Sequence, residues 1–247
     1  MTTAPLLPML LAQTRSEFAI RWRVPAFSLT SLVLPIVFFT FFGLPYAGQT
    51  FPNGVSVGAY LLASFAAYAV GNVMVYGFGI GVAVERGQKV DVLLRATPLP
   101  PGVAISAKVL NALIFSLLSI SALIVYGVVA GGIHQGVAVW LNVIVRLLAG
   151  SLPFVGLGFA IGYSVGPNAA PAVANLVYLP LAFASGLFMP VSQLPGFVQR
   201  LAPYLPSYHY GQLAWSAVGA PAESLAVSLA WLASIVVLGL ITKFAGI

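Results

Sequence analysis

The chain has 247 residues, of which 60% are hydrophobic and only 6% are charged, with a formal net charge of +6. Soluble domains carry about 25% charged residues, so this composition excludes a water-soluble globular protein and indicates lipid as the solvent for most of the chain. The absence of cysteine excludes disulfides and thiolate sites. A strand-like alternation typical of membrane barrels is missing. The bases flank apolar runs and do not gather on one soluble face, so nucleic acid is not an expected partner.

Residues 6–23, within an N-terminal region 1–23, are predicted to form an amphipathic helix on the membrane surface. A cleavable signal peptide is not evident, because Pro5–Ala12 is short and lacks both a preceding basic region and a small-residue cleavage site. The side chains expected to face lipid are Leu7, Leu10, Leu11, Phe18 and Trp22, and those expected to face water are Gln13, Arg15, Glu17, Arg21 and Arg23.

Six apolar runs follow, each close to the roughly 20 residues that a membrane-spanning helix needs. They are Val24–Tyr46, Val55–Val84, Val109–Ala130, Val139–Val165, Ala172–Val191 and Leu225–Ile241. The sequence therefore predicts an all-α, polytopic membrane protein with six transmembrane helices, forming a single transmembrane domain over residues 1–247.

The distribution of lysine and arginine predicts the orientation, because cytoplasmic loops carry the excess of these residues. With the N-terminus in the cytoplasm, the outer side holds Arg200 alone. The cytoplasmic segments then hold Arg15, Arg21, Arg23, Arg86, Lys89, Arg95, Lys108 and Lys243. Six spans return the C-terminus to the cytoplasm, so the predicted location is the inner or plasma membrane of the cell with both termini cytoplasmic.

The segment 85–108 is the longest stretch that does not resemble membrane-embedded sequence, and it holds two acids and four bases. Val90, Leu93 and Leu94 share one face of a short predicted helix, which the proline at position 98 would end. A short helix with an apolar face and a charged rim suits a groove on another protein. The alternative is a solvated loop that carries positive-inside charges.

The second predicted span carries a polar and aromatic residue at every fourth position, namely Tyr60, Ser64, Tyr68, Asn72 and Tyr76. This spacing forms a slowly drifting stripe on one side of a helix. Polar side chains in hydrocarbon need partners, so the stripe is expected to face protein or a wet pathway. Two interpretations stay open: a substrate pathway lined by aromatic residues, and helix packing in which adjacent small residues allow close approach.

The fourth predicted span carries Gly158, Gly162 and Gly166, a spacing that favours helix packing over a transport role. The last two glycines also frame a G-x-S-x-G pattern around Ser164. That hydrolase pattern requires a strand–turn–helix context, so no catalytic residue is predicted. Arg146, expected near the outer end of this span, is a functional candidate by its position, although a structural role at the interface is favoured.

The segment 195–223 contains too many prolines to span the membrane, and its aromatic residues are typical of an interfacial belt. His209 is not expected to bind a metal ion, because no second histidine, cysteine or acidic cluster stands near it in the sequence.

Two motifs resemble the membrane subunits of type-2 ABC exporters. The first is Glu85-Arg86 followed by Leu94-Arg95-Ala96-Thr97-Pro98-Leu99, and the second is Ser185-Gly186-Leu187-Phe188-Met189-Pro190 followed by Leu194-Pro195 and Leu205-Pro206. Their order and spacing extend the resemblance over most of the chain. Many family members have Gly-Thr where Lys89-Val90 stand here and an acid where Gly87 stands, a difference that concerns the detailed docking of the 85–108 segment.

The resemblance implies a permease subunit that pairs with a second, expected identical, permease subunit and binds a cytoplasmic ABC ATPase. Coupling to the ATPase would involve Glu85, Arg86, Lys89, Asp91, Leu93, Leu94 and Arg95. The segment 195–223 would form re-entrant helices of an outer gate that contains Tyr204, Tyr208, His209 and Tyr210. Because the chain has no G-x-x-x-x-G-K-[ST] loop, ATP and magnesium are expected on the ATPase, and no cofactor or metal is expected on this chain.

The run Leu94–Leu99 looks most like the branch that exports drugs or lipophilic compounds from the cytoplasm or inner leaflet, and this is the expected function. Export of polysaccharide or glycolipid is the nearest alternative. A self-contained secondary transporter or channel is an alternative of another class, and the lack of acids near the predicted midplane counts against it. A membrane protease would rest on the Ser164 pattern alone.

Overall fold

A computed structural model describes residues 5–90, 93, 96–97 and 99–244, with the side chains of residues 26 and 236–244 left out. This part of the chain is helical and forms no sheet, apart from one isolated bridge between Thr50 and Ser56. The helices are α1 (Leu6–Trp22), α2 (Pro25–Phe42), α3 (Val57–Gly87), α5 (Pro101–Gly131), α6 (Val137–Ala149), α7 (Leu152–Ser164), α8 (Ala170–Ala184), α9 (Gly196–Leu201), α10 (Pro206–Ala217) and α11 (Leu225–Phe244), with short 3-10 turns at Leu44–Tyr46, Val191–Gln193 and Ala202–Tyr204. The all-α prediction is confirmed.

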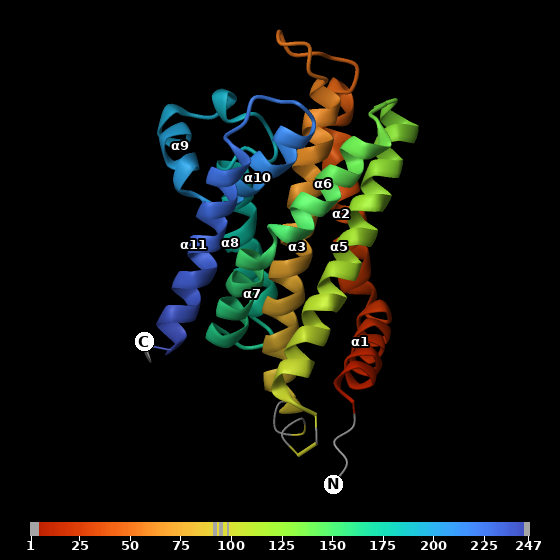
Figure 1. Ribbon diagram of the computed structural model, residues 1–247, viewed down its shortest axis with the longest axis vertical. Helices are drawn as coiled ribbons and strands as arrows, with labels where there is room; N and C mark the ends of the chain where they lie inside the picture. The colour runs from red at the N-terminus through yellow and green to blue at the C-terminus, as the bar shows by residue number, and fades with distance from the viewer. Residues whose placement is uncertain (1–4, 91–92, 94–95, 98, 245–247) are drawn as a thin grey trace.

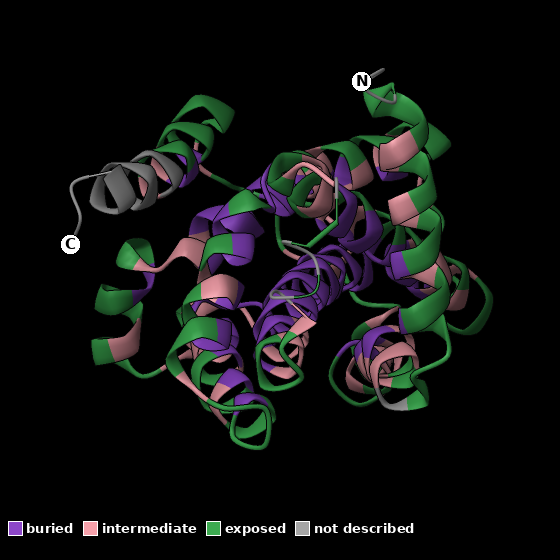
Figure 2. Ribbon diagram, turned by 90° about the horizontal axis from the view of Figure 1, so that it is seen from below, coloured by how far each residue is buried: buried purple, intermediate pink, exposed green. Residues whose placement is uncertain are grey.

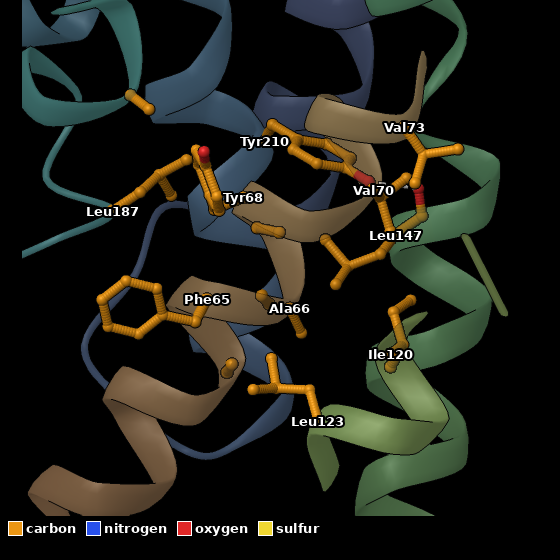
Figure 3. Close-up of a cluster of buried hydrophobic side chains, with 14 of the residues drawn as sticks. Phe65, Ala66, Tyr68, Val70, Val73, Ile120, Leu123, Leu147, Leu187 and Tyr210 are labelled. Atoms are coloured by element: carbon orange, nitrogen blue, oxygen red, sulfur yellow. Dashed lines mark hydrogen bonds between the residues drawn. The ribbon is translucent and has the colours of Figure 1, made fainter. Parts of the chain in front are cut away.

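Helix α3 is the centre of the bundle (Figure 2). Its N-terminus is capped by Ser56, whose hydroxyl accepts a hydrogen bond from the Ala59 amide at 3.2 Å. In its most apolar stretch 83% of the residues are buried, against 39% for α5. Helix α3 therefore packs against protein on all sides, whereas α5 leaves one face for lipid. Figure 3 shows side chains of α3 meeting Ile120 and Leu123 of α5, Leu147 of α6 and Tyr210 of α10 in the core.

Glycine allows α7 to approach α3 closely. A Cβ added at Gly158 would lie 2.8 Å from the Phe78 Cβ, and one added at Gly162 would lie 2.9 Å from the Gly79 carbonyl oxygen. The packing interpretation is confirmed at these two positions. It is wrong for Gly166, which lies beyond the end of α7 at Ser164 and where an added Cβ would meet nothing within 4 Å.

Two apolar stretches are bent. The helical pair α1 and α2 bends by 69°, and the pair α6 and α7 bends by 42° at Gly150–Ser151. Among the described residues, α3 and α5 are long and apolar enough to cross a membrane, and the number rises to four if each bent pair is one span. Helices α8 and α11 are shorter apolar helices, the latter over Leu225–Ile235. The count of six spans stays a prediction.

Two predicted boundaries are wrong. The third span begins at Pro101 and not at Val109, because proline is well suited to the first turn of a helix, where its missing N–H leaves no bond unmade. The segment 85–108 therefore includes the last residues of α3 and the first eight residues of α5. The fifth span ends at Ala184 and not at Val191, since Gly186 adopts a left-handed φ of 83° that turns the chain.

The two ends of the bundle differ (Figure 1). Helix α1, the C-terminal end of α3, the first turns of α5 and the C-terminal part of α11 lie toward one end. The connection between α2 and α3 lies at the other end, together with α9 and α10. The segment predicted to contact a soluble partner is thus on the same side as α1.

Candidate functional site

Four charged side chains from three helices form a cluster where α3 ends. The Lys108 Nζ of α5 donates to the Glu17 Oε1 of α1 at 2.9 Å, and also to the carboxylate of Glu85 on α3. The Arg21 Nε lies 3.8 Å from the Glu17 Oε2. The lysine is thus held between two carboxylates, and the cluster joins α1, α3 and α5.

The cluster corrects the expected orientation of α1. The helix exists as predicted, but Glu17 and Arg21 are buried against the bundle and do not face water. The Arg21 Nη1 donates to the Gly77 carbonyl oxygen at 3.2 Å, and a Cβ added at Gly77 would lie 2.9 Å from Nη1, so the guanidinium would have to shift. Phe18 also turns inward, with its ring 5.2 Å from that of Phe115.

Burial lowers the pKa of the Arg21 guanidinium, an effect that the carboxylates of Glu17 and Glu85 partly offset. The arginine nevertheless stays charged, as arginines in proteins do. A charge in apolar surroundings is tolerated only when it is paired and hydrogen-bonded. The four-residue cluster meets this condition, which explains why α1 lies against the bundle.

The residues predicted to couple to an ATPase are placed in three ways. Glu85 faces Lys108 inside the molecule. The Arg86 Nη1 donates to the carbonyl oxygens of Gly162 and Tyr163 at 2.8 and 2.9 Å, so it binds the end of α7. Lys89 and Leu93 are exposed. Asp91, Leu94 and Arg95 lie outside the described residues, and the docking surface stays a prediction.

Lys89 has a left-handed backbone, with φ at 56°. It is the second residue after Gly87, with which α3 ends, and its amide donates to the Arg86 carbonyl oxygen at 3.1 Å. This conformation costs an ordinary residue about 1–2 kcal/mol but is free for glycine. The conformation gives a physical reason for the glycine that many family members have where Lys89 stands. It also marks the sharp turn after α3.

All five residues of the stripe on α3 are buried inside the protomer. The Ser64 Oγ accepts a hydrogen bond from the Trp215 Nε1 at 2.7 Å, and the Tyr60 ring stacks on Trp215 with centroids 5.2 Å apart. The Tyr68 ring stacks on Tyr178 at 5.6 Å. The stripe therefore packs against α8 and α10, as the helix-packing interpretation requires.

Two further contacts lie at the lower end of the stripe. The Tyr178 hydroxyl donates to the Tyr68 carbonyl oxygen at 2.9 Å, over Gly71, and Tyr76 donates to the Asn175 Oδ1 on α8. The Asn72 amide is buried and has no hydrogen-bond partner among the described residues. Among the described residues, Asn72 is therefore the member of the stripe whose polar group is buried without a hydrogen bond.

The outer aromatic residues point in different directions. Tyr204 is exposed, whereas Tyr210 is buried and donates to the Leu147 carbonyl oxygen at 2.7 Å. The His209 Nδ1 lies 3.0 Å from the Glu223 Oε2, its Nε2 lies 2.8 Å from the Pro203 carbonyl oxygen, and its ring stacks on Trp231 of α11. Within the described part of the chain, no three His, Asp or Glu side chains form a group that could hold a metal ion.

A cavity of about 450 Å³ opens beside this outer segment. Tyr60 from the stripe and Tyr208 from the outer segment both line it, together with Asn53, Gln212 and Trp215. The structure thus brings one residue of the stripe and one residue of the predicted outer gate to the same cavity. The other four stripe residues do not line it.

Arg146 lies on α6, one turn before the bend at Gly150–Ser151. It donates to the Asn142 Oδ1 at 2.6 Å and to the Ser216 Oγ of α10 at 2.7 Å. Its role in the protomer is therefore to connect α6 to α10. Ser164 is the last residue of α7 and donates to the Ala160 carbonyl oxygen, so it lies at a helix end and not in the strand–turn–helix context of a hydrolase nucleophile.

Sequence reasoning missed the partners Lys108–Glu17 and Ser64–Trp215. The first pair had a usable signal, since Glu17 is one of only four acids in the chain and a charge beside apolar helices requires an opposite charge. The second pair joins residues 151 positions apart and had no signal in one sequence.

Comparison with known proteins agrees with this architecture. The profile of the ABC-2 type transporter family matches residues 9–217. The chain is 31% identical over 192 residues to the protein named "Putative transport permease YvfS" of Bacillus subtilis (strain 168), an alignment that covers 78% of each chain.

Proposed function

Since the chain belongs to the ABC-2 type transporter family as a membrane permease subunit, we propose that it works in ATP-driven export together with a separate cytoplasmic ABC ATPase. The observation that carries this proposal is the Lys108 cluster. Glu85 and Lys108 frame the segment predicted to dock on the ATPase, and Glu17 ties both to α1. A displacement of the segment would then move α1, α3 and α5 together.

A rigid connection is what such coupling needs. Buried ion pairs hold one geometry, since separating them leaves uncompensated charge. Helix α3 extends from this cluster through the core to the outer cavity. A movement at the docking segment would therefore reach Tyr60 along a single helix, and Tyr208 of α10 lines the same cavity. The transporter would alternate between inward- and outward-facing states.

We propose a lipophilic compound or drug as the substrate. The aromatic side chains Tyr60, Tyr208 and Trp215 around the outer cavity support this class, because ligand sites for such compounds are mostly apolar with a few polar groups. The stripe from Ser64 to Tyr76 would contribute to the pathway if α3 becomes accessible in another state. Polysaccharide or glycolipid export is the second candidate, since aromatic faces also suit sugars.

We further propose a homodimer of this permease with two ATPase subunits, in the inner or plasma membrane with both termini cytoplasmic. The exposed apolar residues Leu29, Phe41 and Leu176 support the membrane location, and membership of the family supports the pairing of two permease subunits. The excess of bases at the α1 end supports the orientation.

The experiment is transport into inverted vesicles that contain the chain with or without a co-expressed ABC ATPase subunit. ATP-dependent accumulation of a lipophilic dye only with the ATPase is expected. Transport by the permease alone would overturn the proposal.

Reversing the charges of Asp91 and Arg95 is expected to weaken co-purification of the ATPase, and unchanged co-purification would remove the docking surface. Tyr208→Ala is expected to alter which dyes are transported, whereas Tyr204→Ala serves as the exposed control.

A further inference from the structure

A groove along α7 forms a cavity that the proposed function does not use. It has a volume of about 1010 Å³, and Gly156, Phe159 and Tyr163 of α7 line it opposite Leu181 of α8 and Ile235 of α11. Among the described side chains that line it, Tyr163 carries the one polar group. In a bilayer such an apolar surface is filled by hydrocarbon, since water would gain no hydrogen bonds there.

We propose that this groove binds one anionic phospholipid, with an acyl chain along α7 and the phosphate against Arg86. The lipid comes from the leaflet on the side of the 85–108 segment. Arg86 also belongs to the residues predicted to couple to the ATPase, but lipid binding in the groove requires neither nucleotide nor the ATPase.

The length of the groove fits one leaflet. Its wall on α7 extends from Leu152 to Tyr163, eleven residue steps of 1.5 Å, or roughly 16 Å. Half of the hydrocarbon core of a bilayer is roughly 15 Å. An acyl chain that starts at Tyr163 would therefore end near Leu152, where α7 begins at the bend.

The charge at the Tyr163 end selects the headgroup. Arg86 is exposed, and its guanidinium lies 5.2 Å from the centroid of the Tyr163 ring. Its Nη1 caps the last carbonyls of α7, but no carboxylate among the described residues pairs with it. Its remaining N–H groups form a planar donor set that matches a phosphate. The site is thus apolar along its length and cationic at one mouth.

The experiment measures lipid binding to the purified full-length chain by native mass spectrometry. The probes are dioleoyl phosphatidylglycerol and, as an uncharged match with the same chains, dioleoylglycerol. One basic residue near a membrane surface favours an anionic lipid about fivefold, and this preference is expected in the wild type. Arg86→Gln is expected to remove the preference and to leave dioleoylglycerol binding unchanged.

Gly156→Phe tests the groove itself, because a side chain added at this position meets nothing within 4 Å and projects into the open space. The variant is expected to weaken the binding of both lipids about tenfold or more, since each buried methylene contributes to binding. Val125→Phe, on the exposed face of α5, is the matched control and is expected to change neither.

Three results would overturn the proposal. Equal binding of both lipids to the wild type would remove the headgroup site. Unchanged binding to Gly156→Phe would place the lipid elsewhere on the surface. The third result is efficient disulfide formation between two copies of Leu157→Cys, a variant whose cysteine is unique because the chain has none. It would mean that a second protomer, and not lipid, covers the groove.

Discussion

Lys108 holds three helices together with one ammonium group. Its neighbours Glu17 and Glu85 are ion-paired with it, and Glu17 is buried. Removing one member of such a group leaves the others charged in a poorly solvated site, and that penalty exceeds the loss of the contact itself. The link between α1 and the docking segment therefore depends on these few charged residues.

Lys108→Met is expected to destabilise the protein by about 3 kcal/mol, the lower part of the range for a broken buried pair, because Glu85 is partly exposed. Thermal unfolding in detergent measures the change. Adding Glu85→Gln to this variant should restore part of the loss, because Glu85 loses its ion-pair partner whereas Glu17 keeps Arg21. Arg15→Met, at an exposed position of α1, is the control and should stay within about 0.5 kcal/mol. A loss for Lys108→Met as small as that of Arg15→Met would contradict the role of the cluster.

Lys89→Gly is expected to stabilise the protein by about 1 kcal/mol, because glycine adopts the φ of 56° without strain. Gln88→Gly should instead destabilise it by up to about 1 kcal/mol, since Gln88 has a φ of −89° and glycine adds only entropy to the unfolded chain. Chemical unfolding of the two variants side by side gives the comparison. If both change stability in the same direction, the strain at Lys89 is not significant.

At the scale of elements, the contact between α7 and α3 depends on which glycines face the central helix. Gly158 and Gly162 do, and Gly156 on the same helix faces open space. In a membrane the hydrophobic effect does not drive helices together, because lipid is as apolar as the side chains. Close van der Waals contact between backbones stabilises the helix pair instead. The groove and the packed face of α7 thus lie on opposite sides of a single helix.

Gly158→Ala is expected to destabilise the protein by about 1–3 kcal/mol, because the added Cβ would lie 2.8 Å from the Phe78 Cβ and 2.9 Å from the Met74 carbonyl oxygen. Gly156→Ala adds the same methyl group where nothing is within 4 Å, and is expected to stabilise the helix by up to about 1 kcal/mol. Thermal unfolding of both variants measures the difference. Equal effects would show that α7 does not approach α3 as closely as described.

On the scale of the whole molecule, the two ends of the bundle should be accessible from opposite sides of the membrane. The chain has no native cysteine, so single cysteines report their own surroundings. We expect a membrane-impermeant maleimide added to intact cells to label Tyr204→Cys, at an exposed outer position, and to label Lys89→Cys only after the cells are opened. Phe65→Cys, in the core, should stay unlabelled in both cases. Labelling of Lys89→Cys in intact cells would reverse the orientation and remove the ATPase contact.

Composition, the lengths of the apolar runs and the motifs around Glu85 and Gly186 were enough to determine an all-helical membrane permease of this family. These are local properties, because bilayer thickness alone sets the length of an apolar helix. Only the tertiary structure decided which way each helix faces. Glu17 pairs with Lys108 across 91 positions, and the stripe on α3 faces α8 and α10 and not open space. Periodicity identifies a face of a helix but not its neighbour, since that neighbour is selected by the close packing of residues far apart in the chain.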